Sequence, residues 1–598
     1  MILEKSLQNK KLDRTNFLVV LTKILVISLV AIYLLGNFNP YFEGSDSYSY
    51  AMTAKDFSQG KFFYTNEFLF SGEEEFFPHD KLKINDGKHA IWAGPIGFFG
   101  LITTSYVLAG NYGLFYFGPI FGIIFLIVAE RISSNLFGKY VGLLTLLFLS
   151  TNHLFFRSAL NLQTESVYTI CILTACYFLI KFFKSNNNSF LIGTSILFVF
   201  ASLLRTSGVM YFPIELTLII GFFITIKFKS RIKFQIKSNS IIEKKFSSIT
   251  KKRFLKILFL ILIPWILFFA FYFSYHAYFF DDPLTNRVVL RHGEENTDVK
   301  LSSLFVINEK NYENIKEYSK YVLPYQFPRI VDTSSELFSN LDNLFGKNWI
   351  GLLGLFSLLF FFIFSIWKGN NRLSMIIFSS MILITIFFFS SITSESRSLR
   401  GDLPARYMFP AFSFYYMILG IMLVNFIKYS NKKKLFHKKI LLGLKIILVS
   451  ILITFLLSSF YFSPPIQAIS NNNFQFQNPI EFDKKYPLNK EGLSENDILV
   501  SINFEAIDYG LIPFKSLVKD KTISDNSLEL LKNVLKNNYN VYTLKNPFDY
   551  VDKNIYHGIS ENPDFVLVDF SDSFCKIELI SAKNYANELK SNPNCLDF

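Results

Sequence analysis

The chain has 598 residues, of which 51% are hydrophobic and 18% are aromatic. This composition excludes an ordinary soluble protein and is typical of proteins that cross a membrane many times. The net charge of +13 does not indicate a nucleic-acid partner, because the basic residues gather beside apolar segments, as they do in cytoplasmic loops of membrane proteins.

Apolar segments long enough to cross a hydrocarbon core of ~30 Å recur along the chain, and we expect about 11 transmembrane helices. They are predicted at 17–36, 113–130, 140–156, 160–183, 190–204, 208–227, 255–277, 348–367, 372–391, 404–427 and 440–462. The apolar stretch 90–110 is predicted to lie along the membrane surface or to re-enter it. A full crossing there would place the later basic loops on the wrong side.

The distribution of basic residues predicts the orientation of the chain. Lysines and one arginine precede the first apolar segment, which we interpret as a retained signal-anchor with a cytoplasmic N-terminus. Outer segments are then expected at 37–112, 278–346 and 392–403, followed by a long tail. The prediction is a multi-pass cell-membrane protein with a transmembrane domain at 1–462 and an extracytoplasmic domain at 463–598.

The tail is predicted to form a small α/β domain. Short β-like runs at 498–502, 541–544 and 565–570 alternate with helix-like runs such as 527–537. The tail also contains two of the four cysteines, Cys575 and Cys595, and the sequence leaves open whether they form a disulfide.

A polar stretch directly after the first apolar segment is the strongest candidate for a catalytic site. It contains Asp46, followed by Tyr50 and Ala54 at helical spacing. A carboxylate in a partly dehydrated cleft near the membrane surface can act as a base. The alternative is that Asp46 is an ordinary solvated loop residue.

Residues 45–60 resemble the first outer loop of the GT-C glycosyltransferases, a superfamily that includes protein O-mannosyltransferases and the transferases that add aminoarabinose to lipid A. Further segments resemble family motifs in the expected order over residues 1–462, and the tail is not covered. These segments are Trp92–Gly97, Ala129–Lys139, Arg157–Glu165, Leu203–Gly208, Asp282–Leu284 and Arg406–Pro410.

The resemblance implies a GT-C type helical bundle that takes a polyprenyl-phosphate sugar donor from within the bilayer. Transfer to a protein, lipid or glycan acceptor would occur outside the cytoplasm, by an inverting displacement with Asp46 as general base. The leaving phosphate departs as an anion and needs cations nearby, for which arginine is well suited. The candidate donor-phosphate ligands are Arg157, Arg205, Arg291 and Arg406.

Three further residues are candidates for the site. Glu165 is expected as a second catalytic carboxylate that positions the acceptor or shares a metal, with a helix N-terminal charge as the alternative reading. Tyr50 and His89 are expected to contact substrate. No cofactor and no metal site are predicted, although a divalent metal is left open.

Two other functions remain open on the sequence. An oligosaccharyltransferase of the same superfamily would carry a Trp-Trp-Asp-Tyr-Gly motif, of which the tail matches only Asp508-Tyr509-Gly510. A lipid-linked glycan transporter or flippase would carry ionisable residues in the middle of its spans. The sequence offers few of these.

Overall fold

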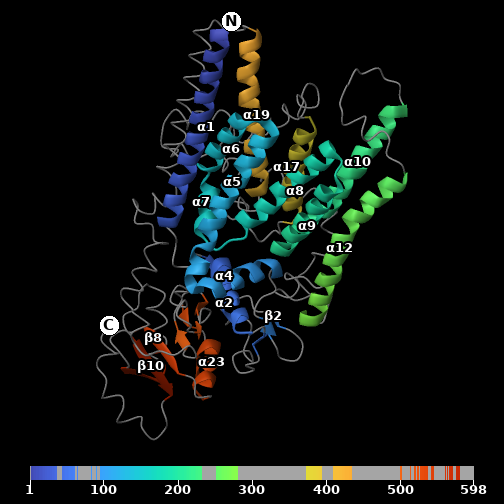
Figure 1. Ribbon diagram of the computed structural model, residues 1–598. Helices are drawn as coiled ribbons and strands as arrows, with labels where there is room; N and C mark the ends of the chain where they lie inside the picture. The colour runs from blue at the N-terminus through green and yellow to red at the C-terminus, as the bar shows by residue number, and fades with distance from the viewer. Residues whose placement is uncertain are drawn as a thin grey trace, which may run out of the picture. The chain divides into compact units, whose positions relative to one another are not determined.

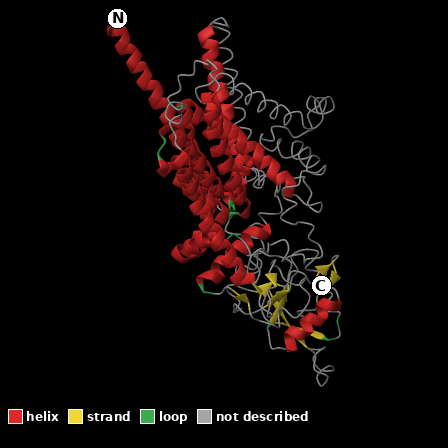
Figure 2. Cartoon of the chain, turned by 90° about the vertical axis from the view of Figure 1, so that its right-hand side faces the viewer, coloured by secondary structure: helices red, strands yellow, loops and turns green. Residues whose placement is uncertain are grey.

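The computed structural model is mainly helical (Figure 1; Figure 2). The ranges that the structure describes are 2–36, 44–60, 95–231, 251–280, 372–392 and 409–433, with short strands near 63–64, 82–83 and 89–90 and separate segments between 498 and 579. The chain divides into two compact units. The first consists of Met1–Asn39, Gly94–Tyr275 and Asn296–Gln467, and the second of Pro40–Ala93, His276–Glu295 and Ala468–Phe598.

The first unit is a bundle of long apolar helices, which confirms the prediction of a polytopic helical protein. Its helices are α1 (Ile2–Gly36), α4 (Ile96–Phe115), α5 (Phe117–Phe137), α6 (Lys139–Leu149), α7 (His153–Leu160), α8 (Glu165–Ser185), α9 (Asn188–Leu204), α10 (Tyr211–Arg231), α12 (Lys251–Phe280), α17 (Arg372–Ile392) and α19 (Phe409–Lys433). Among the described residues, five helices have the length and hydropathy of a membrane span, or six if one bent pair is counted. The expected spans at 348–367 and 440–462 lie outside the described residues, so the predicted total stays a prediction.

Helix α8 forms the centre of this bundle. It contacts α5, α9, α17 and α19, and most of its side chains are buried. In contrast, α1 and α12 expose many large apolar side chains along their length, as expected of helices that face lipid.

The predicted span at 140–156 is not one continuous helix, because the helix breaks. Helix α6 ends at Leu149, and α7 runs on from it with a bend of 76°. Asn152 explains the break: its Oδ1 accepts a hydrogen bond from the backbone N–H of Phe155 at 3.0 Å and caps α7. Its Nδ2 donates to the hydroxyl of Tyr416 at 2.7 Å, so a distant helix holds the capping residue in place.

The stretch predicted as a surface or re-entrant segment forms helix α4, which is not among the helices with the length and hydropathy of a span. The helix is interrupted at Gly110, whose φ of 59° and ψ of −144° are not helical and favour glycine. Helix α4 contacts α5 and α9 and lies across the end of the bundle in Figure 1.

A buried carboxyl group in mid-bundle was not predicted. Glu215 lies within the span Ser207–Ile224 and has no exposed surface. Ser195 Oγ lies 2.7 Å from its Oε1, and the indole Nε1 of Trp265 donates to its Oε2 at 3.0 Å. These contacts join α9, α10 and α12, so a polar network ties the lipid-facing helix α12 to the bundle.

The second unit contains helix α2 (Gly44–Ser58) and a mixed sheet in the order β5-β4-β8-β10-β9. Its strands are β4 (Ile498–Val500), β5 (Ile512–Pro513), β8 (Val541–Leu544), β9 (Phe565–Asp569) and β10 (Phe574–Leu579). Strand β4 runs parallel to β5 and β8, and β10 pairs antiparallel with β8 and β9. The predicted β-like runs are therefore strands.

Helix α23 (Asp525–Lys536) covers part of this sheet by contacting β10, and it matches the predicted helix-like run. Lys532 links it to the turn before β9 through an ion pair with Asp564, with 2.5 Å between Nζ and Oδ2. That hydrogen bond raises the pKa of the Lys532 ammonium. Cys575 is disulfide-bonded, and Cys595 lies outside the described residues.

We expect Trp265→Phe to lower the melting temperature of the purified protein in detergent, because it removes the N–H donor and leaves a buried carboxyl oxygen without that hydrogen bond. The expected loss of stability is about 1–3 kcal/mol. Phe271→Leu on the lipid-exposed side of the same helix is the matched control and should leave the melting temperature unchanged. Equal melting temperatures for Trp265→Phe and wild type would contradict a tie between α12 and the bundle.

Candidate active site

The site is built at the start of helix α8, on Glu165. Thr164 occupies the N-cap position, and the apolar residues that follow anchor the helix in the bundle. The position at a helix N-terminus favours a negative charge. Glu165 nevertheless lies in the protein interior, where only 3% of its side chain is exposed, and a buried carboxylate needs a partner.

Arg205 supplies that partner from the end of helix α9. It is the C-cap residue, and its extended backbone leads into a short 3₁₀ helix (Thr206–Met210). Its Nη1 donates to Glu165 Oε1 at 3.0 Å, and 14% of its side chain is exposed. The arginine is therefore the more accessible member of the ion pair.

The ring of Tyr168 lies beside the ion pair, against Arg205. The guanidinium of Arg205 lies over its ring at 5.9 Å from the centroid, which is cation–π distance. The hydroxyl of Tyr168 lies 3.3 Å from that of Ser207, next to the turn that carries Arg205. Tyr211 packs behind Tyr168, with 6.4 Å between the ring centroids.

Buried polar side chains surround the start of α8. The hydroxyls of Ser158 and Ser166 lie 3.3 Å apart. The buried polar residues of this segment are Ser158, Asn161, Gln163, Thr164, Glu165, Ser166 and Thr169. The start of α8 is therefore polar although most of the bundle is apolar.

Asp46 lies in the first turn of helix α2 in the second unit, which confirms the predicted helical spacing of Asp46, Tyr50 and Ala54. The side chains of Tyr50 and Ala54 are buried, whereas that of Asp46 is outside the described part. The role of Asp46 as a base stays a prediction.

The structure brings together two of the predicted site residues, Glu165 and Arg205. From the sequence they are predicted to have separate roles, Glu165 as a catalytic carboxylate and Arg205 as a ligand of the donor phosphate. Arg157 lies in α7 and His89 in β3 (His89–Ala90), and neither side chain is described. Arg291 and Arg406 lie outside the described residues.

Sequence reasoning missed Tyr168 and Ser207. Tyr168 follows Glu165 by three positions, which places both on one face of a helix, so this signal was available. The role of Ser207 depends on how α8 meets the turn after α9. No group of three or more His, Cys, Asp or Glu side chains arranged to hold a metal occurs within the described ranges.

We expect Arg205→Met to destabilise the protein by roughly 3–5 kcal/mol, because it leaves the buried Glu165 carboxylate without its counter-ion. Adding Glu165→Gln should recover much of this loss. A double-mutant cycle on melting temperatures in detergent measures the coupling. Purely additive effects of the two substitutions would contradict an energetically significant pair.

Comparisons with known proteins give a family match over part of the chain. Residues 94–237 match the family model of the dolichyl-phosphate-mannose-protein mannosyltransferases, and this segment contains both Glu165 and Arg205. No curated protein sequence matches the chain.

Two solved structures illustrate the fold. ArnT from Cupriavidus metallidurans, bound to undecaprenyl phosphate, is 11% identical, with 94% of this chain and 98% of that chain covered and a TM-score of 0.50. The oligosaccharyltransferase AglB from Archaeoglobus fulgidus is 12% identical, with 89% and 70% covered and a TM-score of 0.45. The family match and the fold shared with ArnT support a GT-C membrane glycosyltransferase.

Proposed function

We propose that this enzyme transfers a sugar from a polyprenyl-phosphate donor to a protein, lipid or glycan acceptor on the outer face of the cell membrane. The observation that carries the proposal is the buried ion pair of Glu165 and Arg205 within the segment that matches the mannosyltransferase family. The description of that family names a dolichyl-phosphate sugar, and the ArnT structure holds undecaprenyl phosphate, which supports a lipid-linked donor.

In the proposed reaction, Asp46 accepts the proton from a hydroxyl group of the acceptor. The acceptor oxygen forms a bond to the anomeric carbon as the bond from that carbon to the phosphate oxygen breaks, so the configuration inverts. The polyprenyl phosphate keeps the electron pair and leaves as an anion. No second carboxylic acid is needed, because the leaving group does not have to be protonated.

Arg205 is the proposed ligand of the donor phosphate. Its guanidinium is the more accessible member of the pair, and its planar fork of N–H donors fits a phosphate as well as it fits a carboxylate. An incoming phosphate therefore competes with Glu165 for Arg205. We expect the displaced carboxylate to accept a hydrogen bond from the acceptor, so that donor binding prepares the acceptor site.

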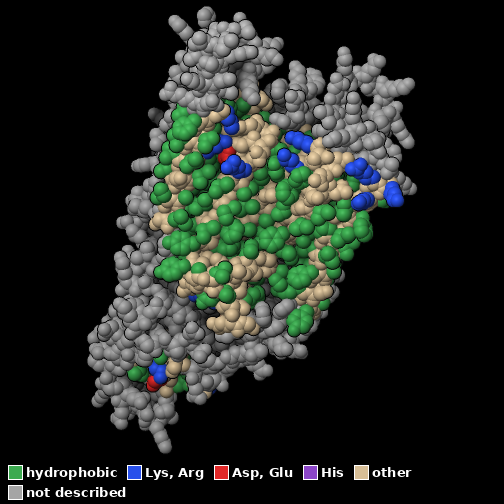
Figure 3. Space-filling view, in the orientation of Figure 1, with side chains coloured by type: hydrophobic (Ala, Val, Ile, Leu, Met, Phe, Trp, Pro, Cys, Tyr) green, Lys and Arg blue, Asp and Glu red, His purple; other side chains and the backbone are tan. Residues whose placement is uncertain are grey.

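The basic residues support the proposed orientation. Lysine and arginine side chains gather toward one end of the bundle (Figure 3). Arg131 lies in the second half of α5, Lys139 begins α6, and Lys181 and Lys184 lie near the end of α8. Glu165 and Arg205 lie at the opposite ends of the helices that carry or flank those residues. By the positive-inside rule, the basic end is cytoplasmic and the site opens to the outside.

Asp46→Asn should abolish most transfer of labelled sugar from polyprenyl-phosphate hexose by the purified protein, because asparagine keeps the size but cannot accept the proton. We expect a loss of at least roughly 10²-fold. Glu43→Gln, a neighbouring carboxylate, is the matched control and should retain activity. Full activity of Asp46→Asn would exclude this residue as the base.

Glu165→Gln should bind undecaprenyl phosphate more tightly than wild type while its KM for acceptor rises, because Arg205 no longer has to leave a carboxylate. We expect about a tenfold gain in affinity, the equivalent of ~1.4 kcal/mol. Binding to the purified protein in detergent measures this directly. Glu130→Gln, which also neutralises a carboxylate paired with a cation within the bundle, should not change the affinity. Weaker binding by Glu165→Gln would contradict the exchange of partners.

A further inference from the structure

Helix α1 places one charged residue on an otherwise apolar contact face. Its buried side chains are Val19, Val30 and Leu34, while most other described positions of its span face outward. Lys23 lies between these positions, in the span Asn16–Gly36, and only 13% of its side chain is exposed. A cation in this place is costly in a membrane unless a partner compensates its charge.

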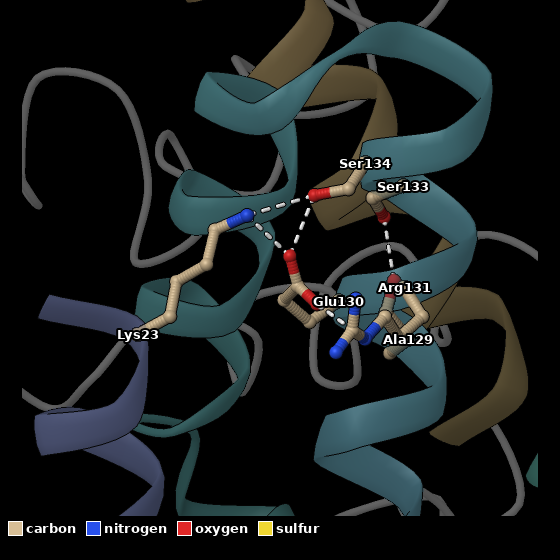
Figure 4. A network of polar contacts seen from close by, with 6 residues as sticks. All are labelled: Lys23, Ala129, Glu130, Arg131, Ser133 and Ser134. Carbon is tan, nitrogen blue, oxygen red and sulfur yellow. Dashed lines mark hydrogen bonds and ion pairs between the residues drawn. The ribbon is translucent and has the colours of Figure 1, made fainter. Parts of the chain in front are cut away.

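Glu130 of helix α5 is that partner (Figure 4). Lys23 Nζ donates to Glu130 Oε1 and, at 2.9 Å, to Ser134 Oγ. Ser134 Oγ donates to the same carboxylate oxygen at 2.5 Å, and Arg131 Nε lies 3.9 Å from the other oxygen. The carboxylate thus contacts two cations and a hydroxyl group, with only 7% of the Glu130 side chain exposed.

Helix α6 makes room for this cluster at Gly142. A Cβ atom there would lie 2.0 Å from Ser134 Oγ and 2.9 Å from Glu130 Oε1, closer than atoms can approach. The absence of a side chain at Gly142 therefore lets three helices meet around one ion pair. The cluster can form at only one axial position of the three helices, because the small residue, the hydroxyl group and the two opposite charges must lie at matching heights.

A buried ion pair fixes the position of a helix along its axis, here called its height, more strictly than apolar contacts do. Leucine and valine side chains lose little when a helix slides, because lipid tails are as apolar as the neighbouring helix. A slide of one turn, ~5.4 Å, would separate Lys23 from Glu130 and leave the Lys23 ammonium without its counter-ion within the bundle. The pair therefore selects one axial position of α1.

We infer that the ion pair of Lys23 and Glu130 is a positioning device for the reaction: it fixes the height of α1, the helix that precedes the Asp46 segment along the chain. At its outer end, α1 packs Tyr33 edge-on against Phe156 of α7, with 5.3 Å between the ring centroids. The chain reaches α2 within a few residues after Gly36. The catalytic part of this inference rests on the proposed role of Asp46.

The test uses disulfide trapping in the full-length protein, with Tyr33→Cys and Phe156→Cys as the reporter pair. Cys171 and Cys176 are buried, so they are poor competitors for the oxidant. In this background we expect Lys23→Met to slow cross-linking, because α1 is no longer held at one height. Lys23→Arg should cross-link at the parent rate. The double exchange of Lys23→Glu with Glu130→Lys should restore most of the parent cross-linking rate.

Kinetics of the same Lys23 variants without the reporter cysteines separate positioning from stability. A misplaced base lowers kcat, and we expect a fall of roughly 10- to 10²-fold in Lys23→Met with the donor KM nearly unchanged. A loss of melting temperature with wild-type kcat, or cross-linking at the parent rate, would overturn the inference. If Asp46→Asn proves active, the proposed base is wrong, while the cross-linking result still decides whether the pair sets the height of α1.

Discussion

A buried carboxyl group in a membrane bundle must find its partners within the protein, and the described part of the bundle is organised around three places where this requirement is met. Glu130 is paired with Lys23 and Arg131, and Glu165 with Arg205, whereas Glu215 meets two uncharged donors. Each cluster joins different helices. Because leaving one partner alone is far more costly than losing an apolar contact, these clusters specify which helices meet and at what height.

The three clusters have different chemical consequences. Glu215 meets only hydroxyl and indole donors and is fully enclosed, so it serves to hold α12. The pair of Glu130 and Lys23 is nearly enclosed and sets the position of α1. Glu165 and Arg205 form the pair whose cation is partly accessible and which adjoins a region rich in buried hydroxyl groups. That combination supports the proposed exchange of a carboxylate for a substrate phosphate at this pair.

Interrupted helices place the polar groups of the site. A continuous span through residues 140–156 would have carried the chain across the membrane without a polar break. The cap at Asn152, held by Tyr416, instead starts a short helix that leads into the buried polar segment before α8. Similarly, α9 ends at Arg205 in an extended conformation, which turns the guanidinium toward Glu165. Irregular backbone is tolerated at membrane depth where protein surrounds it.

The helical class, most helix positions, the helix that carries Asp46 and the strands of the tail could be predicted from the sequence. These features follow from local rules: a span needs ~20 apolar residues, and a strand or an amphipathic helix shows its own period. The pairing of Arg205 with Glu165, the contact of Glu215 with Trp265 and the helix break before Asn152 became visible in the folded chain alone. Each of these depends on the rotation and height at which two helices pack, and side chains 40 or 50 positions apart leave no periodic signal of such a meeting.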